Sequence, residues 1–452
     1  MMRLFICLMA ALSVAVLTGC GRRADNTVDP SRVVAFAQPA VFPVTAFGDI
    51  EVTGPTAAAL NRQQISILVN QYKVDRRNGV IEMSKTESDY YWEKIAEDPS
   101  RYLIPDSSVI RVTPDVAYTS GSAFAVSREG YLLTNAHVVS DQGSLQTPLD
   151  ALRDPAKQTI SRLIRDIGQA PSAPVGNRVV YSLLKWLASQ YTTKAKFKEA
   201  RVMLITESDA FKRNAPTWND VWVWGQPTAD VRNQRIREIM VRADVIAPGE
   251  VFPGKDVAVL RVNAPDQLIC LPMGDSDAVQ PSTPVYAMGY PAAAVIKPAM
   301  TDEAQYRVIA HEGQIDQKMP MTGGWEAFHF TAEINHGDSG GPVLNNEGQV
   351  IAITVAGNME KAPAQNIAIP INIAKEYLAN ARVKPNGGPV SEHWLRGQQL
   401  FARKNYARAL QEFQEVDNLQ SGLFRGLPLY SHTSTYVKDM EAQSRKLGNL
   451  SR

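Results

Sequence analysis

Cysteine is scarce in this chain, because its 452 residues contain only Cys7, Cys20 and Cys270. A fold held together by disulfides needs an even set of cysteines in a short chain, so that class is excluded. A basic surplus is also missing, since 47 Lys and Arg stand against 46 Asp and Glu. Nucleic-acid-binding proteins carry such a surplus, and we therefore expect no nucleic-acid partner. The chain has neither a cysteine pair nor a His-Glu-x-x-His motif, so we expect no metal and no cofactor.

One apolar run, Leu4–Leu17, follows Arg3 at the start of the chain. Fourteen residues are too few to span a bilayer comfortably, and the arrangement is typical of a signal peptide. The run ends in Leu-Thr-Gly-Cys, which resembles the lipobox of bacterial lipoproteins; a plain signal peptide is the alternative. The resemblance implies removal of residues 1–19 and attachment to a membrane through acylated Cys20. Because Gly21 is not the Asp that favours inner-membrane retention, we expect the bacterial cell envelope, at the periplasmic face of the outer membrane.

The next part of the chain, residues 20–104, is predicted to be an N-terminal arm with short helices. Residues 21–56 show little periodicity, whereas Ala57–Tyr72 and Thr86–Glu97 carry apolar residues at helical spacing. From Ser108 the pattern changes to short apolar runs broken by turn residues, which is typical of strands.

A helical and basic insertion over 142–235 interrupts this strand pattern. Between Arg153 and Arg213 there are twelve Lys and Arg but five Asp and Glu. We interpret the surplus as a solvated helical face; a patch that faces acidic lipid or substrate is the alternative.

Residues 381–391 contain Lys-Pro-Asn-Gly-Gly-Pro and are predicted to be a linker. In the remaining tail, 392–452, small and aromatic residues fall at the offsets of a tetratricopeptide-type helix pair, with a generic helical hairpin as the alternative. The residues are Trp394, Gly397, Tyr406, Ala409 and Phe413. One repeat cannot bury its own apolar face, so the tail must pack against the rest of the chain or bind a protein partner.

Three short segments carry residues suited to nucleophilic catalysis. His137 lies in Thr-Asn-Ala-His-Val-Val, Asp256 precedes Val-Ala-Val-Leu, and Ser339 lies in Gly-Asp-Ser-Gly-Gly. A serine hydroxyl is a weak nucleophile that needs an adjacent base, and the oxyanion formed on attack needs N–H donors. We interpret Ser339 as the nucleophile, His137 as its base and Asp256 as the group that orients His137. The main-chain N–H groups of Gly337 and Ser339 would form the oxyanion hole.

Together these segments resemble trypsin-like serine proteases, and more narrowly the HtrA (Deg) branch. The order His, Asp, Ser is typical of the chymotrypsin-type fold, and TNAHVV, DVAVL and EINHGDSGGPVLNNEGQVIAI match the HtrA pattern. The resemblance covers residues 105–380. It implies a mainly β fold, a double six-stranded β-barrel of trypsin-like type, to which the helical insertion and a small C-terminal helical extension are added. It also implies a serine endopeptidase that cleaves protein or peptide substrates in the envelope.

The resemblance further implies substrate-binding residues. Thr354, Val355 and Ala356 would lie on the edge strand that pairs with substrate backbone. Glu333, six residues before Ser339, either forms an acidic pocket floor that favours Lys or Arg, or turns to solvent or pairs elsewhere.

The chain also departs from the family pattern. The insertion separates His137 from Asp256, and no PDZ-like strand pattern follows residue 380. Asp338 lacks the freshly cut N-terminus that neutralises the matching residue of trypsins. These departures keep one alternative open, a non-catalytic binding or scaffold protein on a protease fold. The Gly-x-Ser-x-Gly string also suits an α/β-hydrolase, but no Asp lies between Ser339 and the next histidine, His393.

Overall fold

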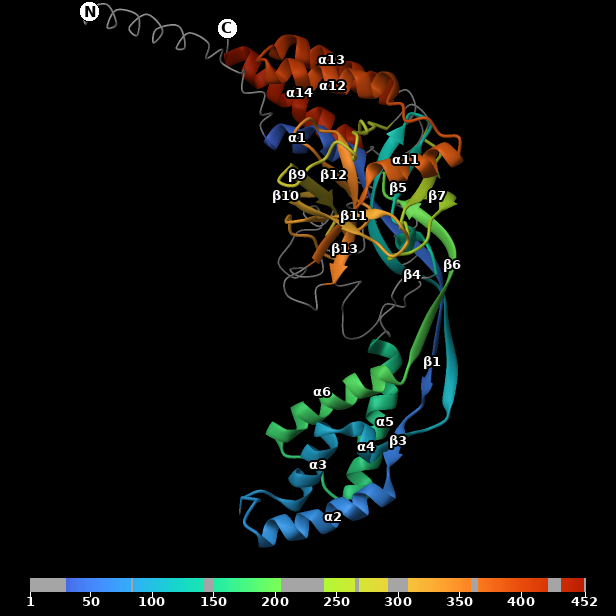
Figure 1. The fold of residues 1–452 in the computed structure, drawn as a ribbon, viewed down its shortest axis with the longest axis vertical. Helices are drawn as coiled ribbons and strands as arrows, with labels where there is room; N and C mark the ends of the chain where they lie inside the picture. Colours follow the sequence, from blue (N-terminus) through green and yellow to red (C-terminus); the bar gives the residue numbers. More distant parts are fainter. Residues whose placement is uncertain are drawn as a thin grey trace, which may run out of the picture.

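The computed structural model (Figure 1) describes residues 30–82, 84–141, 149–204, 240–264, 268–291, 308–358, 365–421 and 432–450. Its upper part contains two closed β-barrels of six strands each. In barrel order, the first has β1 (Val41–Pro55), β4 (Ser108–Ser127), β5 (Tyr131–Thr134), β8 (Ala258–Val262), β7 (Val241–Pro248) and β6 (Thr192–Val202). The second has β10 (Ile309–Pro320), β11 (Glu326–Phe330), β14 (Gln365–Pro370), β13 (Val350–Asn358), β12 (Pro342–Leu344) and β9 (Pro284–Gly289). The double six-stranded barrel of trypsin-like type is therefore confirmed.

Each barrel encloses an apolar core of its own. Phe42, Leu132 and Leu260 are fully buried in the first, and Phe328 and Phe330 in the second. A third apolar cluster lies between the barrels and extends to the helices that follow β14. Because the strands are covered on both faces, several of them read as continuous apolar runs rather than as alternating patterns.

Residues 41–55 correct one expectation, because they belong to the first barrel and not to an irregular arm. β1 pairs with β4 from Val41 opposite Phe124 to Pro55 opposite Ser108, and with β6 on its other side. Pro43 and Gly48 interrupt the sequence pattern that marks a strand. Two flanking strands satisfy the backbone of β1 and outweigh its weak local preference.

A helical lobe lies at the far end of β1, β4 and β6 (Figure 1). Its helices are α2 (Arg62–Arg77), α3 (Glu87–Glu97), α4 (Pro99–Tyr102), α5 (Leu149–Ile167) and α6 (Ala173–Ser189); β2 (Ala58–Leu60) and β3 (Leu103–Pro105) pair beside them. The N-terminal helices and the insertion, which are far apart in sequence, thus share one apolar core. Its members include Leu68, Trp92, Ile95, Leu163 and Leu183.

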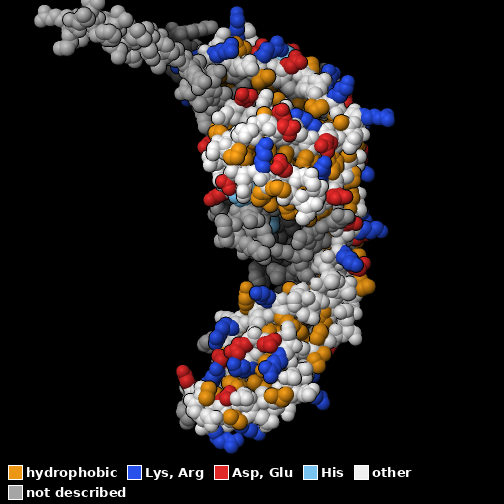
Figure 2. All heavy atoms as spheres, in the orientation of Figure 1, with side chains coloured by type: hydrophobic (Ala, Val, Ile, Leu, Met, Phe, Trp, Pro, Cys, Tyr) orange, Lys and Arg blue, Asp and Glu red, His pale blue; other side chains and the backbone are white. Residues whose placement is uncertain are grey.

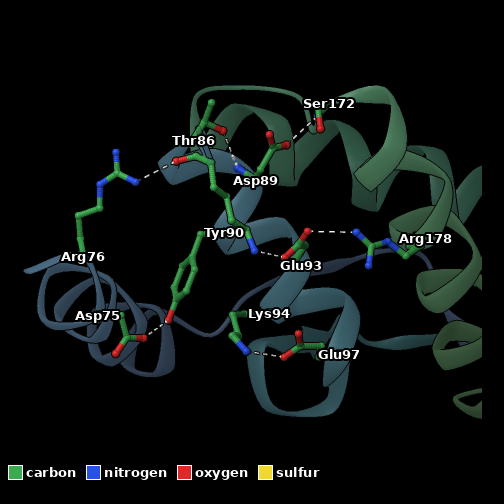
Figure 3. A network of polar contacts seen from close by, with 11 residues as sticks. Asp75, Arg76, Thr86, Asp89, Tyr90, Glu93, Lys94, Glu97, Ser172 and Arg178 are labelled. Carbon is green, nitrogen blue, oxygen red and sulfur yellow. Dashed lines mark hydrogen bonds and ion pairs between the residues drawn. The ribbon is translucent and has the colours of Figure 1, made fainter. Parts of the chain in front are cut away.

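Polar contacts also hold the helices of the lobe together, within the N-terminal segment and between it and the insertion (Figure 3). The Tyr90 hydroxyl donates to the Asp75 carboxylate at 2.8 Å and links α3 to α2. Arg178 of α6 lies 3.1 Å from the Glu93 carboxylate of α3. Acidic side chains from outside the insertion therefore neutralise part of its basic charge. Figure 2 accordingly shows basic and acidic side chains interspersed on the visible face of the lobe.

The C-terminal helices α12 (Gly388–Ala402), α13 (Tyr406–Ser421) and α14 (His432–Leu450) pack against the N-terminal helix α1 (Pro30–Ala37) and the short η1 (Gln38–Ala40). Trp394 is fully buried, and its Nε1 donates to the Phe36 carbonyl at 2.9 Å. A Cβ at Gly397 of α12 would lie 2.4 Å from the Phe413 ring of α13, so α12 and α13 cross closely. The expected helical extension is present, and it packs on the chain's own N-terminal segment.

The segment predicted to be a linker is tied to β4 and runs into α12. The Asn386 N–H donates to the Val126 carbonyl at 3.0 Å, and the Arg128 N–H donates to the Asn386 carbonyl at 2.6 Å. Helix α11 (Ile371–Asn380) precedes this segment. Within the described ranges no helix combines the length and the apolar character needed to cross a bilayer. Cys20 and the predicted signal peptide, residues 1–19, lie outside those ranges.

Candidate active site

His137 and Asp256 are brought together by the pairing of two strands of the first barrel. His137 lies in η2 (Ala136–Val139) directly after β5, and Asp256 lies just before β8. Thr134 pairs with Ala258, so two segments that are 119 residues apart meet at the same end of the sheet. His137 Nδ1 lies 2.6 Å from Asp256 Oδ2, and the His137 main-chain N–H donates to Asp256 Oδ1 at 2.9 Å.

The surroundings of Asp256 hold this pair in one geometry. The Asp256 side chain is fully buried, whereas the His137 side chain is 24% exposed. The Asn135 side-chain amide donates to the Asp256 carbonyl at 2.7 Å, which ties the two loops together again. A buried carboxylate beside Nδ1 favours the tautomer that carries its proton there, and leaves Nε2 as the basic nitrogen.

Ser339 lies on a loop that packs directly against β4 and the segment before His137. The Ser122 N–H donates to the Ser339 carbonyl at 2.7 Å. A Cβ at Gly340 would lie 2.2 Å from the Ser122 carbonyl oxygen and 3.0 Å from the Asn135 nitrogen. Ser339 itself is 3% exposed. The fold therefore gathers His137, Asp256 and Ser339 where the two barrels meet.

The loop before Ser339 forms a tight turn that Ser122 holds in place. The Asp338 N–H donates to the Asn335 carbonyl at 3.1 Å, and Gly337 has a φ of +102°, which the third residue of a type II turn requires. The Ser122 hydroxyl donates to the Gly337 carbonyl at 2.7 Å and accepts the Tyr290 N–H at 2.9 Å. Among the described residues the Gly337 N–H has no acceptor, as an oxyanion donor requires.

Asp338 is buried beside this turn and accepts the Asn335 N–H at 2.8 Å through Oδ2. Its Oδ1 is also buried and has no hydrogen-bond partner within the described ranges. Burial raises the pKa of Asp338 to about 6, while the Asn335 N–H acts in the opposite direction. Gly289 packs against this carboxylate, because a Cβ there would lie 2.6 Å from Oδ1. The sequence alone did not identify a hydrogen-bond partner for Asp338, and in the structure that partner is the Asn335 main-chain N–H.

The residues predicted to bind substrate have different surroundings. The Thr354 N–H and carbonyl both bond the nucleophile loop at 2.9 Å, to the Gly341 carbonyl and the Gly340 N–H respectively. Val355 is buried on β13 opposite Ile367 of β14. The backbone of Ala356 continues β13, and its side chain lies outside the described residues.

Glu333 is exposed and lies near His311 of β10. Burial lowers the pKa of His311, and the charge of Glu333 raises it. The role of Glu333 in substrate binding stays a prediction. In the described part of the chain no three His, Cys, Asp or Glu side chains gather as a metal site would require. Cys270 is buried, which raises the pKa of its thiol to about 12.

Sequence reasoning missed Ser122, Asn135 and Tyr290. A single serine or asparagine near a strand has no chemical signature, because its role depends on partners more than a hundred residues away. Asn135 lies two residues before His137, so proximity to a candidate base was the only signal that could have found it.

A buried carboxylate–imidazole pair beside a glycine-rich serine loop, set between two six-stranded barrels, defines the trypsin-like class. Residues 201–353 match the family model described as a trypsin-like peptidase domain. The match includes Asp256 and Ser339, whereas His137 precedes it because the helical insertion lies between. This part of the chain is thus similar to a trypsin-like peptidase domain.

Curated relatives with the name "Serine protease HtrA-like" come from Staphylococcus aureus strains USA300 and NCTC 8325. Each is 27% identical over 134 residues, which is 28% of this chain and 17% of the relative. The chain therefore matches only about a sixth of the length of these relatives.

Two solved structures are similar at low scores. One is titled "HtrA-type protease AlgW with tripeptide" (16% identity, TM-score 0.35, 77% of this chain and 62% of the other). The second is a serine endoprotease from Yersinia pestis (14% identity, TM-score 0.34, 78% and 65%). The fold assignment itself rests on the two barrels of this chain.

Proposed function

We propose that this protein is a serine endopeptidase of the HtrA-like type. The observation that carries the proposal is the 2.6 Å contact between His137 Nδ1 and the buried Asp256 carboxylate, next to the loop that holds Ser339. Burying a charged carboxylate costs free energy unless the carboxylate is paired. Here the buried Asp256 carboxylate is paired with the imidazole of His137, which it orients and which is itself partly exposed. The matched peptidase domain and the HtrA-like relatives support the same activity.

In the proposed acylation step, the Ser339 hydroxyl oxygen attacks the carbonyl carbon of the substrate peptide bond. His137 Nε2 accepts the hydroxyl proton, and Asp256 stabilises the resulting imidazolium without taking the proton. The tetrahedral oxyanion is bound by the N–H groups of Gly337 and Ser339. His137 then protonates the leaving nitrogen, the carbon–nitrogen bond breaks, and an ester to Ser339 remains.

Deacylation repeats these steps with water. His137 takes a proton from the water as it attacks the ester, and returns that proton to the Ser339 oxygen when the acid product leaves. The substrate backbone would lie along β13 from Val355 and Ala356, because Thr354 already bonds the nucleophile loop.

The test is labelling of the purified protein with a fluorophosphonate probe. We expect the wild type to be labelled, Ser339→Ala to remain unlabelled, and His137→Ala to be labelled far more slowly. Ser276→Ala is the matched control, because Ser276 is also a buried serine but accepts the Asn372 N–H elsewhere in the chain. A folded wild type without any Ser339-dependent labelling would contradict the proposal and leave a non-catalytic scaffold.

We further propose that acylation at Cys20 holds this protease at the periplasmic face of the outer membrane, where it cleaves envelope proteins. The support is the apolar run that ends in Leu-Thr-Gly-Cys. Wild type but not Cys20→Ser should incorporate labelled palmitate and sediment with outer membranes.

We also propose that the exposed surface of the tetratricopeptide-like helices α12 and α13 binds a protein partner. A pull-down with the wild type should recover this partner, and deletion of 392–452 should abolish its recovery.

A further inference from the structure

Strands β4, β1 and β6 leave the first barrel as a three-stranded ribbon that carries the helical lobe (Figure 1). β1 is the central strand of this ribbon, with β4 on one side and β6 on the other. The outer side of β4 pairs with β5 only from Phe124 onward, and the outer side of β6 pairs with β7 only from Ala200 onward. In the described ranges no strand therefore pairs with the outer sides of Ser108–Thr113 or Thr192–Glu199.

The two outer strands differ in how they present their edges. On β6 an exposed lysine stands at every second position, Lys194, Lys196 and Lys198. Lysines on an edge strand discourage the pairing of a further strand, and natural sheets use them for this purpose.

On β4 the corresponding side chains are aliphatic. The exposed fraction is 38% for Val109, 65% for Ile110 and 57% for Val112. The charged residue of this stretch, Arg111, interacts with the hydroxyl of Tyr191. Ser108–Thr113 is therefore an apolar edge without the protection that β6 carries, which is the arrangement to which extended peptides add as a further strand.

The length of this edge defines what it can hold. Pro114 follows it and has no N–H to donate, and Asp115 has a φ of +59°, so the regular edge ends after six residues. Ile110 and Val112 lie on one face, opposite Thr53 and Glu51 of β1, and Val109 lies on the other. One added strand over six residues buries far less than the about 1,200–2,000 Å² of a stable protein interface. The edge therefore suits a weakly bound extended segment better than a second folded copy of the chain.

We propose that the β4 edge, Ser108–Thr113, is an exosite that binds an extended apolar segment of a protein substrate by β-strand addition. Main-chain hydrogen bonds supply the binding, and Ile110 and Val112 select aliphatic or aromatic side chains at alternate positions. This inference rests on the proposed protease activity in one respect, because the bound segment is called a substrate. Binding of the segment itself does not require catalysis.

The test measures binding of a permanently unfolded protein, reduced and carboxymethylated α-lactalbumin, to full-length Ser339→Ala. Adding Ile110→Lys and Val112→Lys places lysines on β4 as β6 has them, and we expect Kd to rise at least about tenfold. The matched control adds Ile67→Lys and Val74→Lys, which replace similarly exposed aliphatic residues on α2 and should leave Kd unchanged. Equal Kd values for the β4 variant and its parent would overturn the proposal.

The same substitutions in the active chain separate this inference from the proposed function. Cleavage of the unfolded protein should slow at least about tenfold, while kcat/KM for a short peptide stays at the wild-type value. Absence of all peptidase activity would refute the proposed function, and the binding assay would still decide the exosite. A wild-type dimer in light scattering that the β4 lysines dissociate would instead assign this edge to self-association and overturn the proposal.

Discussion

Ser122 gives the sharpest prediction about catalysis, because one hydroxyl fixes the turn that contains the proposed oxyanion donor. Its oxygen donates to the Gly337 carbonyl at 2.7 Å and accepts the Tyr290 N–H at 2.9 Å. Ser122→Ala removes both hydrogen bonds, and the loss of a hydrogen bond costs a buried main-chain group about 1–3 kcal/mol. A type II turn becomes type I when its central peptide flips, and that flip would turn the Gly337 N–H away from the oxyanion.

Removing one oxyanion donor outright costs about 10²–10³ in kcat. Ser122→Ala keeps the donor but loosens its turn, so we expect kcat to fall about 10–100-fold, equivalent to ~1.4–2.8 kcal/mol, with KM nearly unchanged. The assay is steady-state hydrolysis of a short peptide, together with the rate of fluorophosphonate labelling. Ser276→Ala controls for the loss of a buried serine hydroxyl away from the site. A folded Ser122→Ala with wild-type kcat, or an equal loss in Ser276→Ala, would refute the reasoning.

Three further predictions concern stability and specificity. Burial raises the pKa of Asp338 from 3.8 to about 6, so the contribution of this residue to stability is lost as pH rises through 6. In denaturant unfolding at pH 8, Asp338→Asn should therefore be more stable than the wild type by on the order of 3 kcal/mol. At pH 3.5 the variant should have no such advantage. Gly397→Ala should lower the free energy of unfolding by about 1–3 kcal/mol through collision with Phe413, whereas Gly448→Ala, with 3.6 Å to its nearest neighbour, should not. Peptides with Lys or Val before the cleaved bond should be hydrolysed at similar rates because Glu333 is exposed, and a Lys preference that Glu333→Gln abolishes would contradict this.

The resemblance to trypsin-like proteases predicted the two barrels correctly. Short local motifs named His137, Asp256 and Ser339 as the candidate triad, whose catalytic role stays a prediction. The Gly-Asp-Ser-Gly-Gly string combines a nucleophile with glycines that a tight turn requires, and Gly337 indeed adopts a φ of +102°. The sequence predicted residues 41–55 poorly, because Pro43 and Gly48 break the alternation that marks a strand. That strand exists through its pairing with β4 and β6, which are distant in sequence.

The amino-acid sequence by itself determined the order of the chemical groups and the near absence of cysteine, and it indicated several helices only approximately, since the helix expected over Ala57–Tyr72 begins at Arg62. The tertiary structure alone decided that the N-terminal helices and the basic insertion form one lobe, since Trp92 and Leu163 share a core only after the chain has folded. It also decided the role of Ser122 and the contrast between the β4 and β6 edges. Local patterns record which face of an element is apolar, whereas hydrogen bonds and strand pairing depend on which distant element lies beside it.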